Sequence, residues 1–135
     1  MEKEILIIDD DADDCMLVKE SLQQVGWKQA IHHVLGGREA LDLLSARKTE
    51  GTLPTVVILD LNMPQIGGME VLTAIRNMGI QVPVVLYTTT CSDDMVTKAK
   101  SLGAYDCVKK GTSYADNLRF ASRILSLANE GSRMS

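Results

Sequence analysis

The sequence predicts an α/β fold, a doubly wound parallel sheet with helices on both faces. Apolar runs without polar alternation occur at 5–8, 56–59 and 84–87, as expected of parallel strands that are buried on both sides. Segments with helical spacing of apolar residues lie between strand candidates, and the order βαβαβαβαβα gives a five-stranded sheet with right-handed crossovers. At 135 residues, we expect one domain over 1–129 and a flexible tail at 130–135.

The first half of the chain contributes two strands and two helices. After the strand at 5–8, Asp11 or Asp13 can cap a helix that Gly26 ends. A weaker strand is expected at 29–34. The inward-facing residues of the first helix are predicted to be Cys15, Val18, Leu22 and Val25, and a short second helix is built on Ala40, Leu41 and Leu44.

The strongest strand signal lies in the middle of the chain. Pro54 precedes the run at 56–59, and the segment 63–68 is predicted to be a loop because Pro64 lacks an N–H donor and two glycines follow. A third helix is then expected on Val71, Ile75 and Met78.

The last third of the chain repeats the strand-helix alternation. Pro83 opens the fourth strand, and Ser92 or Asp93 can cap the next helix. A short strand at 107–108 precedes a final helix at about 113–128. The inward-facing residues of these two helices are predicted to be Met95, Ala99 and Leu102, and Leu118, Ala121, Leu125 and Ala128.

Composition excludes several functional classes. The net charge is −4, from 14 Lys and Arg against 18 Asp and Glu, and without a basic stripe direct nucleic-acid binding is disfavoured. The apolar runs are far shorter than the ~20 residues of a membrane helix, and no secretory apolar segment follows Met1, so a cytoplasmic location is expected. Cys15, Cys91 and Cys107 lack metal-ligand spacing. We interpret them as small hydrophobic residues, with a reactive thiol as the alternative.

Polar residues follow three of the predicted strands. Asp9 and Asp10 follow the first, Asp60 follows the third, and Thr88 ends the fourth. Open parallel sheets bind their ligands beyond the carboxyl ends of the strands, so these side chains are candidates for one site. Clustered carboxylates need a cation or protons to offset their repulsion, and an all-oxygen donor set favours Mg²⁺. The alternative interpretation is that they are helix caps, turn formers and local hydrogen-bonding groups.

A carboxylate beside Mg²⁺ can attack phosphorus and form an acyl phosphate. Such a transfer needs little beyond in-line positioning and charge stabilisation. Thr88 could donate a hydrogen bond to a phosphoryl oxygen, and a lysine after the fifth strand could supply positive charge.

The chain resembles the receiver domain of bacterial response regulators, in its stand-alone, single-domain form, over about 4–127. The resemblance rests on ILIIDDD at 5–11, PTVVILDLNMPQIGG at 54–68, VPVVLYT at 82–88, and the segment 103–110. It implies a flavodoxin-like (βα)5 fold with strand order 2-1-3-4-5.

The resemblance also implies roles for individual residues. Asp60 would accept a phosphoryl group from the phosphohistidine of a histidine kinase and would help to bind Mg²⁺. Asp10 would bind the metal directly, Asp9 through water, and Asn62 through its backbone carbonyl. Thr88 would be the switch hydroxyl. Catalysis would be limited to self-phosphorylation and self-dephosphorylation.

Two departures from the family pattern affect the site. The family usually has Lys-Pro after the fifth strand, where this chain has Lys109, Lys110 and Gly111, and counting from Gly103 favours Lys110 over Lys109 as the phosphate partner. Cys107 stands where the family often has an aromatic residue that changes rotamer.

The resemblance implies protein partners: a histidine kinase or phosphotransfer protein, and a downstream effector that reads the phosphorylated state. A monomer or weak homodimer is expected. The surface that reports phosphorylation would include Lys98, Lys100, Tyr105, Tyr114 and Asn117.

Two other functions remain open from the sequence. A phosphohydrolase that forms an aspartyl phosphate would require a second acid at the position of Asn62. A flavodoxin-like ligand-binding module, for example for FMN, would require a Ser-, Thr- and Gly-rich loop in place of residues 9–11, which are all Asp.

Overall fold

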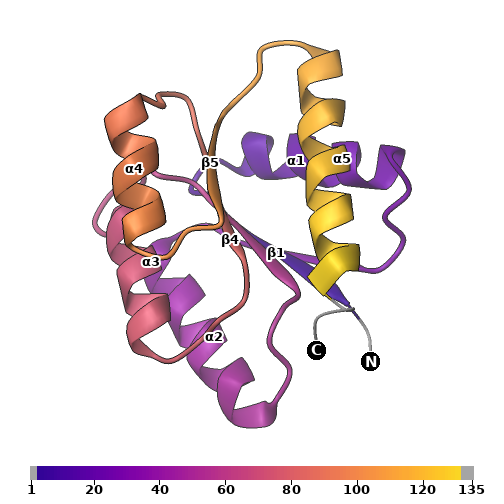
Figure 1. The fold of residues 1–135 in the computed structure, drawn as a ribbon. Coiled ribbons are helices and arrows are strands. Elements are labelled where there is room, and N and C mark those ends of the chain that lie inside the picture. The colour runs from indigo at the N-terminus through magenta and orange to yellow at the C-terminus, as the bar shows by residue number, and fades with distance from the viewer. Residues whose placement is uncertain (1–2, 132–135) are drawn as a thin grey trace.

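The predicted fold is confirmed. A computed structural model describes residues 3–131 and contains a parallel sheet in the order β2-β1-β3-β4-β5 (Figure 1). Each pair of consecutive parallel strands is joined by a crossover that contains a helix. The strands are β1 Glu4–Ile8, β2 Ala30–Val34, β3 Val56–Leu59, β4 Val84–Thr88 and β5 Asp106–Lys109.

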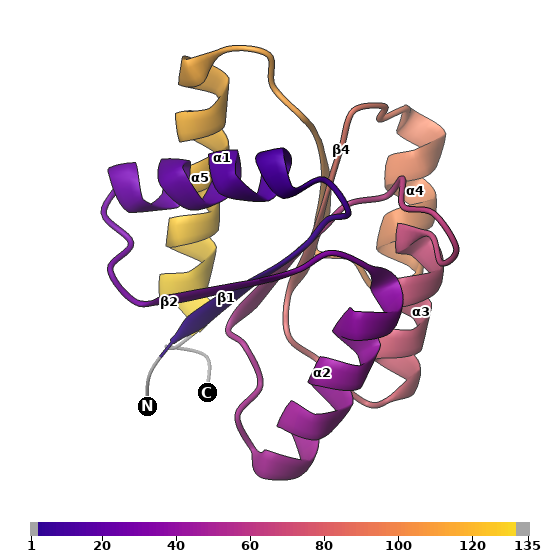
Figure 2. The same ribbon diagram turned by 180° about the vertical axis from the view of Figure 1, so that it is seen from behind.

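The helices form two layers around the sheet. Figures 1 and 2 show α1 and α5 on one face and α2, α3 and α4 on the other. The helices are α1 Ala12–Gln24, α2 Gly37–Glu50, α3 Gly68–Asn77, α4 Asp93–Ser101 and α5 Tyr114–Gly131.

Each face of the sheet has its own hydrophobic core, which explains the uninterrupted apolar runs. In β1, Ile5 and Ile7 pack with α1 and α5, whereas Leu6 and Ile8 pack with the helices of the opposite layer. All four side chains are at most 1% exposed. Burial of one such side chain stabilises the fold by roughly 1.5–3 kcal/mol, so neither face of β1 tolerates a polar residue.

Several helix details differ from the sequence-based predictions. The second helix is not short, because it covers 14 residues. In α4, Val96 and Leu102 pack against the core, and Ala99 is buried, while Met95 is only half-buried. Leu118 was predicted to face inward from α5, but it is only half-buried. The buried residues of α5 are Phe120, Ala121, Ile124, Leu127 and Ala128.

The end of the last helix also differs from the prediction. α5 continues through Glu130 to Gly131 instead of ending at Ala128. The rest of the predicted tail, 132–135, lies outside the described residues. Within the part of the chain that the structure describes, no helix is long and apolar enough to cross a membrane.

Side-chain caps start α1 and α4, the helices that follow the carboxyl ends of β1 and β4. The Asp11 carboxylate accepts hydrogen bonds from the N–H groups of Asp13 and Asp14, at 2.9 and 3.3 Å, and so caps α1. Ser92 caps α4 by accepting from the N–H of Met95 at 3.2 Å. Each cap is typically worth about 1 kcal/mol and fixes the point at which the helix leaves its strand-end loop.

The loop between β3 and α3 returns tightly onto the end of β3. The Gly68 N–H donates to the Leu61 carbonyl at 2.9 Å. A β-carbon on Gly68 would collide with the backbone carbonyl oxygen of Asp60 and lie 2.6 Å from the Cα of Leu61. Only glycine therefore fits where α3 begins.

We expect Gly68→Ala to lower the free energy of unfolding by about 3 kcal/mol, because the clash is with backbone that cannot rotate away. Gly67→Ala is the matched control, since its β-carbon would meet nothing closer than 3.8 Å; loss of a favourable N-cap glycine should cost at most about 1 kcal/mol. Urea unfolding followed by circular dichroism measures both values. Equal losses for the two variants would contradict this account of the loop.

Candidate functional site

Three carboxylates meet at the carboxyl ends of β1 and β3. Strand pairing brings Ile8 level with Leu59, and the Asp60 N–H donates to the Ile8 carbonyl at 2.8 Å. One carboxylate oxygen from each of Asp9, Asp10 and Asp60 lies within 4.8 Å of the others. Asp9 and Asp60 are buried and Asp10 is exposed, so the cluster is open to solvent on the Asp10 side.

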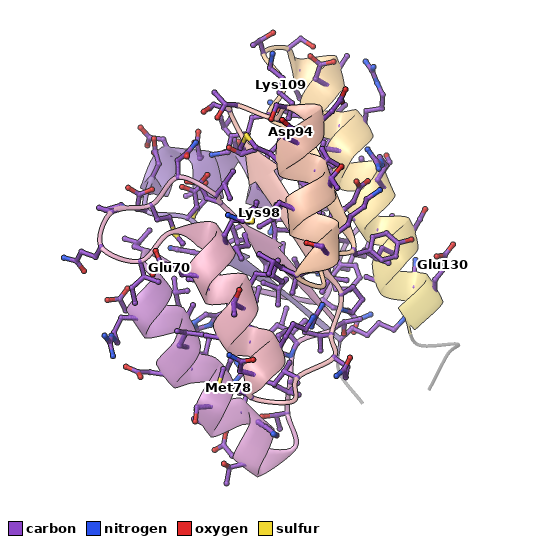
Figure 3. All side chains as sticks on the ribbon, turned by 60° about the vertical axis from the view of Figure 1, so that its left-hand side comes forward. Glu70, Met78, Asp94, Lys98, Lys109 and Glu130 are labelled. Carbon is purple, nitrogen blue, oxygen red and sulfur yellow. The ribbon has the colours of Figure 1, made fainter. Side chains whose placement is uncertain are left out.

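Lys110 reaches into this cluster from the end of β5. Its Nζ lies 2.9 Å from Asp9 Oδ2, 2.8 Å from Asp14 Oδ2 and 3.8 Å from Asp60 Oδ1. Its backbone N–H donates to the Thr88 carbonyl at 2.6 Å, which fixes the lysine next to β4. Lys109 is exposed and lies on the outer surface near α5 (Figure 3). The structure therefore brings Lys110, and not Lys109, to the carboxylates.

The charges in the site shift the titration of two groups. Burial alone would lower the pKa of Lys110, but its hydrogen bonds to Asp14 and Asp9 outweigh burial, so the pKa is raised and the ammonium stays charged. Burial, followed by the charge of Asp9, raises the pKa of Asp60 to about 6, against the opposing effects of Lys110 and the Asn62 N–H. A single ammonium does not fully offset this group of acids.

Asn62 connects Asp60 to Thr88. The Asn62 backbone N–H donates to Asp60 Oδ1 at 3.3 Å, and its side-chain Nδ2 donates to Thr88 Oγ1 at 3.2 Å. Thr88 is fully buried, and its hydroxyl also accepts from the Thr90 N–H at 3.4 Å. Asn62 thus bridges the Thr88 hydroxyl and the Asp60 carboxylate.

Two contacts of the site were not predicted from the sequence. Asp14 shares Lys110 with Asp9, although Asp14 lies in the first turn of α1 and not at a strand end. The only signal was the density of acids over 9–14. For Asn62 the sequence indicated a backbone carbonyl, whereas the structure adds the side-chain contact with Thr88.

The predicted reporting surface is divided in the structure. Tyr114 and Asn117 lie beside α1, where they line a cavity with Leu17, so their grouping with α4 was wrong. On the other side, Lys100 approaches Asp106 at 3.9 Å and connects α4 to β5. Tyr105, Lys98 and Lys100 are exposed there.

The buried aromatic pair of the site lies on β4 and α5. The Tyr87 and Phe120 rings stack with centroids 3.8 Å apart, and the Lys110 ammonium lies 5.9 Å from the Tyr87 ring centroid. Tyr105, in contrast, is 55% exposed. Cys107 is buried on the opposite face of the sheet, with the core of α2, α3 and α4.

Comparison of the sequence with other proteins gives a family match. The response regulator receiver domain family matches residues 5–120. The "Probable methanogenesis regulatory protein FilR2" of Methanothrix harundinacea is 32% identical over 123 residues, which are 89% of this chain and 79% of that protein. The transcriptional regulatory protein PrrA of Mycobacterium tuberculosis is 32% identical over 106 residues, 78% of this chain but 42% of that protein.

Solved structures agree with the sequence comparison. The chemotaxis protein CheY4 of Vibrio cholerae has a TM-score of 0.73 and 26% identity, over 92% of this chain and 99% of that one. The signal receiver domain of a LuxO repressor protein from Vibrio parahaemolyticus has a TM-score of 0.83 over 99% and 95% of the two chains; at 23% identity it supports the fold alone. With the family match over most of the chain, these findings show that this protein belongs to the response regulator receiver domain family.

Proposed function

We propose that this receiver domain accepts a phosphoryl group on Asp60 from the phosphohistidine of a histidine kinase or phosphotransfer protein, in a Mg²⁺-dependent reaction. The observation that carries the proposal is the convergence of three carboxylates within 4.8 Å beside the Lys110 ammonium. Family membership supports it, because response regulators as a class are phosphoacceptors.

The donor set fits a hard divalent cation. The clustered ligand atoms of Asp9, Asp10 and Asp60 are carboxylate oxygens, and the cluster combines buried Asp9 and Asp60 with exposed Asp10. Mg²⁺ binds through one or two carboxylates and retains water. In our proposal Asp10, Asp60 and the Asn62 carbonyl hold it directly and Asp9 holds it through water. When bound, it offsets the carboxylate charges and those of the incoming phosphoryl oxygens.

The transfer step forms one bond and breaks one. A carboxylate oxygen of Asp60 attacks phosphorus, and the P–N bond to the donor imidazole breaks with its electron pair left on nitrogen. The Asn62 N–H and the Lys110 ammonium both favour the ionised Asp60 that this attack requires. Lys110, 3.8 Å from Asp60 Oδ1, is placed to pair with a phosphoryl oxygen. Attack of water on phosphorus later returns the free carboxylate and inorganic phosphate.

The signal begins at Thr88. Its oxygen accepts hydrogen bonds from Asn62 and Thr90, so its own proton is available for a phosphoryl oxygen on Asp60. Movement of the hydroxyl toward that group would pull on the connection from β4 to α4. A downstream protein that binds the two forms with unequal affinity then reads the change. The exposed Lys98 and Lys100 lie on the second half of α4, and Tyr105 lies in the turn between α4 and β5, so the change would reach them through α4.

The two alternative functions fit the site less well. Asn62 donates an amide proton to Thr88 where a phosphohydrolase of the haloacid dehalogenase type would need a second acid. Residues 9–11 carry three carboxylates that would repel the phosphate of FMN.

Phosphorylation is tested with acetyl phosphate and Mg²⁺, followed by intact-mass measurement. We expect the mass of one phosphoryl group, mapped to Asp60, and none in Asp60→Asn, because the amide is not a nucleophile toward phosphorus. Asp42→Asn, an exposed acid on α2, should label like the wild type. An adduct that forms in EDTA, or that survives in Asp60→Asn, would contradict the proposal.

Metal binding is tested separately with Asp10→Asn and calorimetric titration of Mg²⁺. Loss of one charged ligand contact, about 1.5–3 kcal/mol, should weaken Mg²⁺ binding roughly tenfold to a hundredfold. In EDTA the same variant should be more stable to urea than the wild type, because one like charge has been removed from the cluster. Asp42→Asn on the exposed surface of α2 should change neither quantity, and unchanged Mg²⁺ affinity in Asp10→Asn would argue against the ligand assignment.

The roles of Lys109 and Lys110 are distinguished by the binding of beryllium fluoride, which mimics the phosphoryl group. We expect Lys110→Ala to lower the affinity for beryllium fluoride with Mg²⁺ by roughly tenfold or more, the value of one charge-assisted hydrogen bond. Lys109→Ala should match the wild type, since Lys109 is exposed and the Lys110 side chain occupies the site. Fluorine NMR of bound and free ligand gives both affinities, and the reverse order would transfer the role to Lys109.

A further inference from the structure

Two cysteines lie in contact beside the segment that links Thr88 to α4. Cys91 is on the connection between β4 and α4, and Cys107 is on β5. Their Sγ atoms are 3.5 Å apart, and the Cys91 thiol also lies 3.6 Å from the Cys107 carbonyl oxygen. Both are free thiols. A disulfide bond has an S–S length near 2.05 Å, so bond formation requires the sulfurs to approach by roughly 1.5 Å.

The two thiols differ in access to solvent. Cys107 is 6% exposed and belongs to the core under α2, α3 and α4. Cys91 is only half-buried at the edge of that core, directly before the Ser92 cap of α4. Figure 3 shows α4, marked by Asp94 and Lys98, on the outside of the molecule. A small solute can therefore reach Cys91 first.

We propose that Cys91 and Cys107 form a reversible disulfide when the protein meets a hydroperoxide, and that this bond weakens the response of the domain to phosphorylation. The first half of the inference stands on the thiol geometry alone. The second half rests on the proposed phosphoryl acceptance at Asp60.

The chemistry proceeds in two displacements. The Cys91 thiolate, its proton lost to solvent, attacks one oxygen of the hydroperoxide; the O–O bond breaks and leaves a sulfenic acid and, from hydrogen peroxide, water. The Cys107 sulfur then attacks the sulfenic sulfur, the S–O bond breaks, and a second water leaves with the Cys107 proton. In sum, two thiols and one hydrogen peroxide give one disulfide and two waters. The two sulfurs together lose two electrons, and the peroxide gains them.

The order of the two cysteines follows from their surroundings. Burial, with a further contribution from the hydrogen bond to Cys91, raises the pKa of Cys107 to about 12. A thiol that stays protonated is a poor first nucleophile. Cys107 therefore acts second, on a sulfur that already lies against it.

The position of the bond explains its expected effect. Cys91 follows Thr88 by three residues, and Cys107 precedes Lys110 by three. The Lys110 N–H already joins the Thr88 carbonyl at 2.6 Å. A covalent link between 91 and 107 would close a loop around all of α4 and tie the start of that helix to β5. The β4–α4 connection, which must move with Thr88, would then be fixed to β5 and the segment after it at two points: by the hydrogen bond between Thr88 and Lys110 and by the link between Cys91 and Cys107.

The third cysteine offers a matched control. Cys15 is 2% exposed and packs with α1 and α5 on the opposite face of the sheet from Cys107. It shares no contact with the pair, and the sheet separates it from both sulfurs.

The test begins with the full chain in EDTA, without a phosphodonor, treated with graded hydrogen peroxide. We expect a product that has lost two hydrogen atoms and that dithiothreitol restores. Trypsin cleaves after Lys98 and Lys100, so under non-reducing conditions the peptides of Cys91 and Cys107 should remain joined. Cys15→Ser should give the same cross-link, and Cys91→Ser and Cys107→Ser should not. Oxidation of Cys91 to a sulfinic acid without a cross-link, or a cross-link to Cys15, would overturn the inference.

The second arm compares beryllium fluoride binding of the reduced and cross-linked protein with Mg²⁺. We expect the cross-linked form to bind roughly tenfold more weakly, within the usual range for coupled sites, and Cys91→Ser to be insensitive to peroxide. Equal affinities of the two forms would remove the proposed coupling. Binding by the reduced protein that does not require Asp60 would instead contradict the proposed function and leave the cross-link result intact.

Discussion

The structure depends on the way one lysine holds an excess of carboxylates at the ends of parallel strands. The carboxylate oxygens lie within 4.8 Å of one another, and two unit charges at that separation repel by roughly 3–4 kcal/mol at an effective dielectric constant near 20. Lys110 offsets part of this by pairing with Asp9 and Asp14 at 2.9 and 2.8 Å. Burial, together with the remaining negative charge of Asp9 and Asp10, raises the pKa of Asp60. The same imbalance that costs the fold stability would favour binding of a divalent cation, as the proposed function requires.

A closed circuit of contacts joins the residues of the site. The Asn62 N–H donates to Asp60, the Asn62 side chain donates to Thr88, and the Lys110 N–H donates to the Thr88 carbonyl. The Lys110 ammonium then returns to within 3.8 Å of Asp60. A change of charge on Asp60 would therefore alter two contacts together: its ion pair with Lys110 and the hydrogen bond that it accepts from the Asn62 N–H. The ends of β3, β4 and β5 are coupled through four side chains and one backbone contact.

The sequence predicts this fold well where burial on both faces leaves no choice of residue. Runs such as 56–59 coincide with β3 because every side chain there is buried, and the positions of Asp9, Asp60 and Thr88 follow from the strand ends. The sequence predicts the buried residues of the helices less well, because contacts with neighbouring helices determine which residues face the core. α5 packs on α1, so Phe120 is buried and Leu118 is only partly so. The contacts of Asp14 and of the Cys91–Cys107 pair join segments far apart in the chain, which local spacing cannot reveal.

The buried polar atoms of the site already have hydrogen-bond partners before any reaction takes place. Among the residues that the structure describes, no buried side-chain nitrogen or oxygen lacks a hydrogen-bond partner. A phosphoryl group on Asp60 would therefore compete for the Lys110 ammonium, which already pairs with Asp9 and Asp14. Lys110 would give up contact with Asp14 or Asp9, and Thr88 would move relative to Asn62, each exchanging one partner for another. Such an exchange has a small net free energy because bonds made offset bonds lost. Under the proposed function, the domain would then pass between its phosphorylated and unphosphorylated states in both directions, as a signal that must be switched off requires.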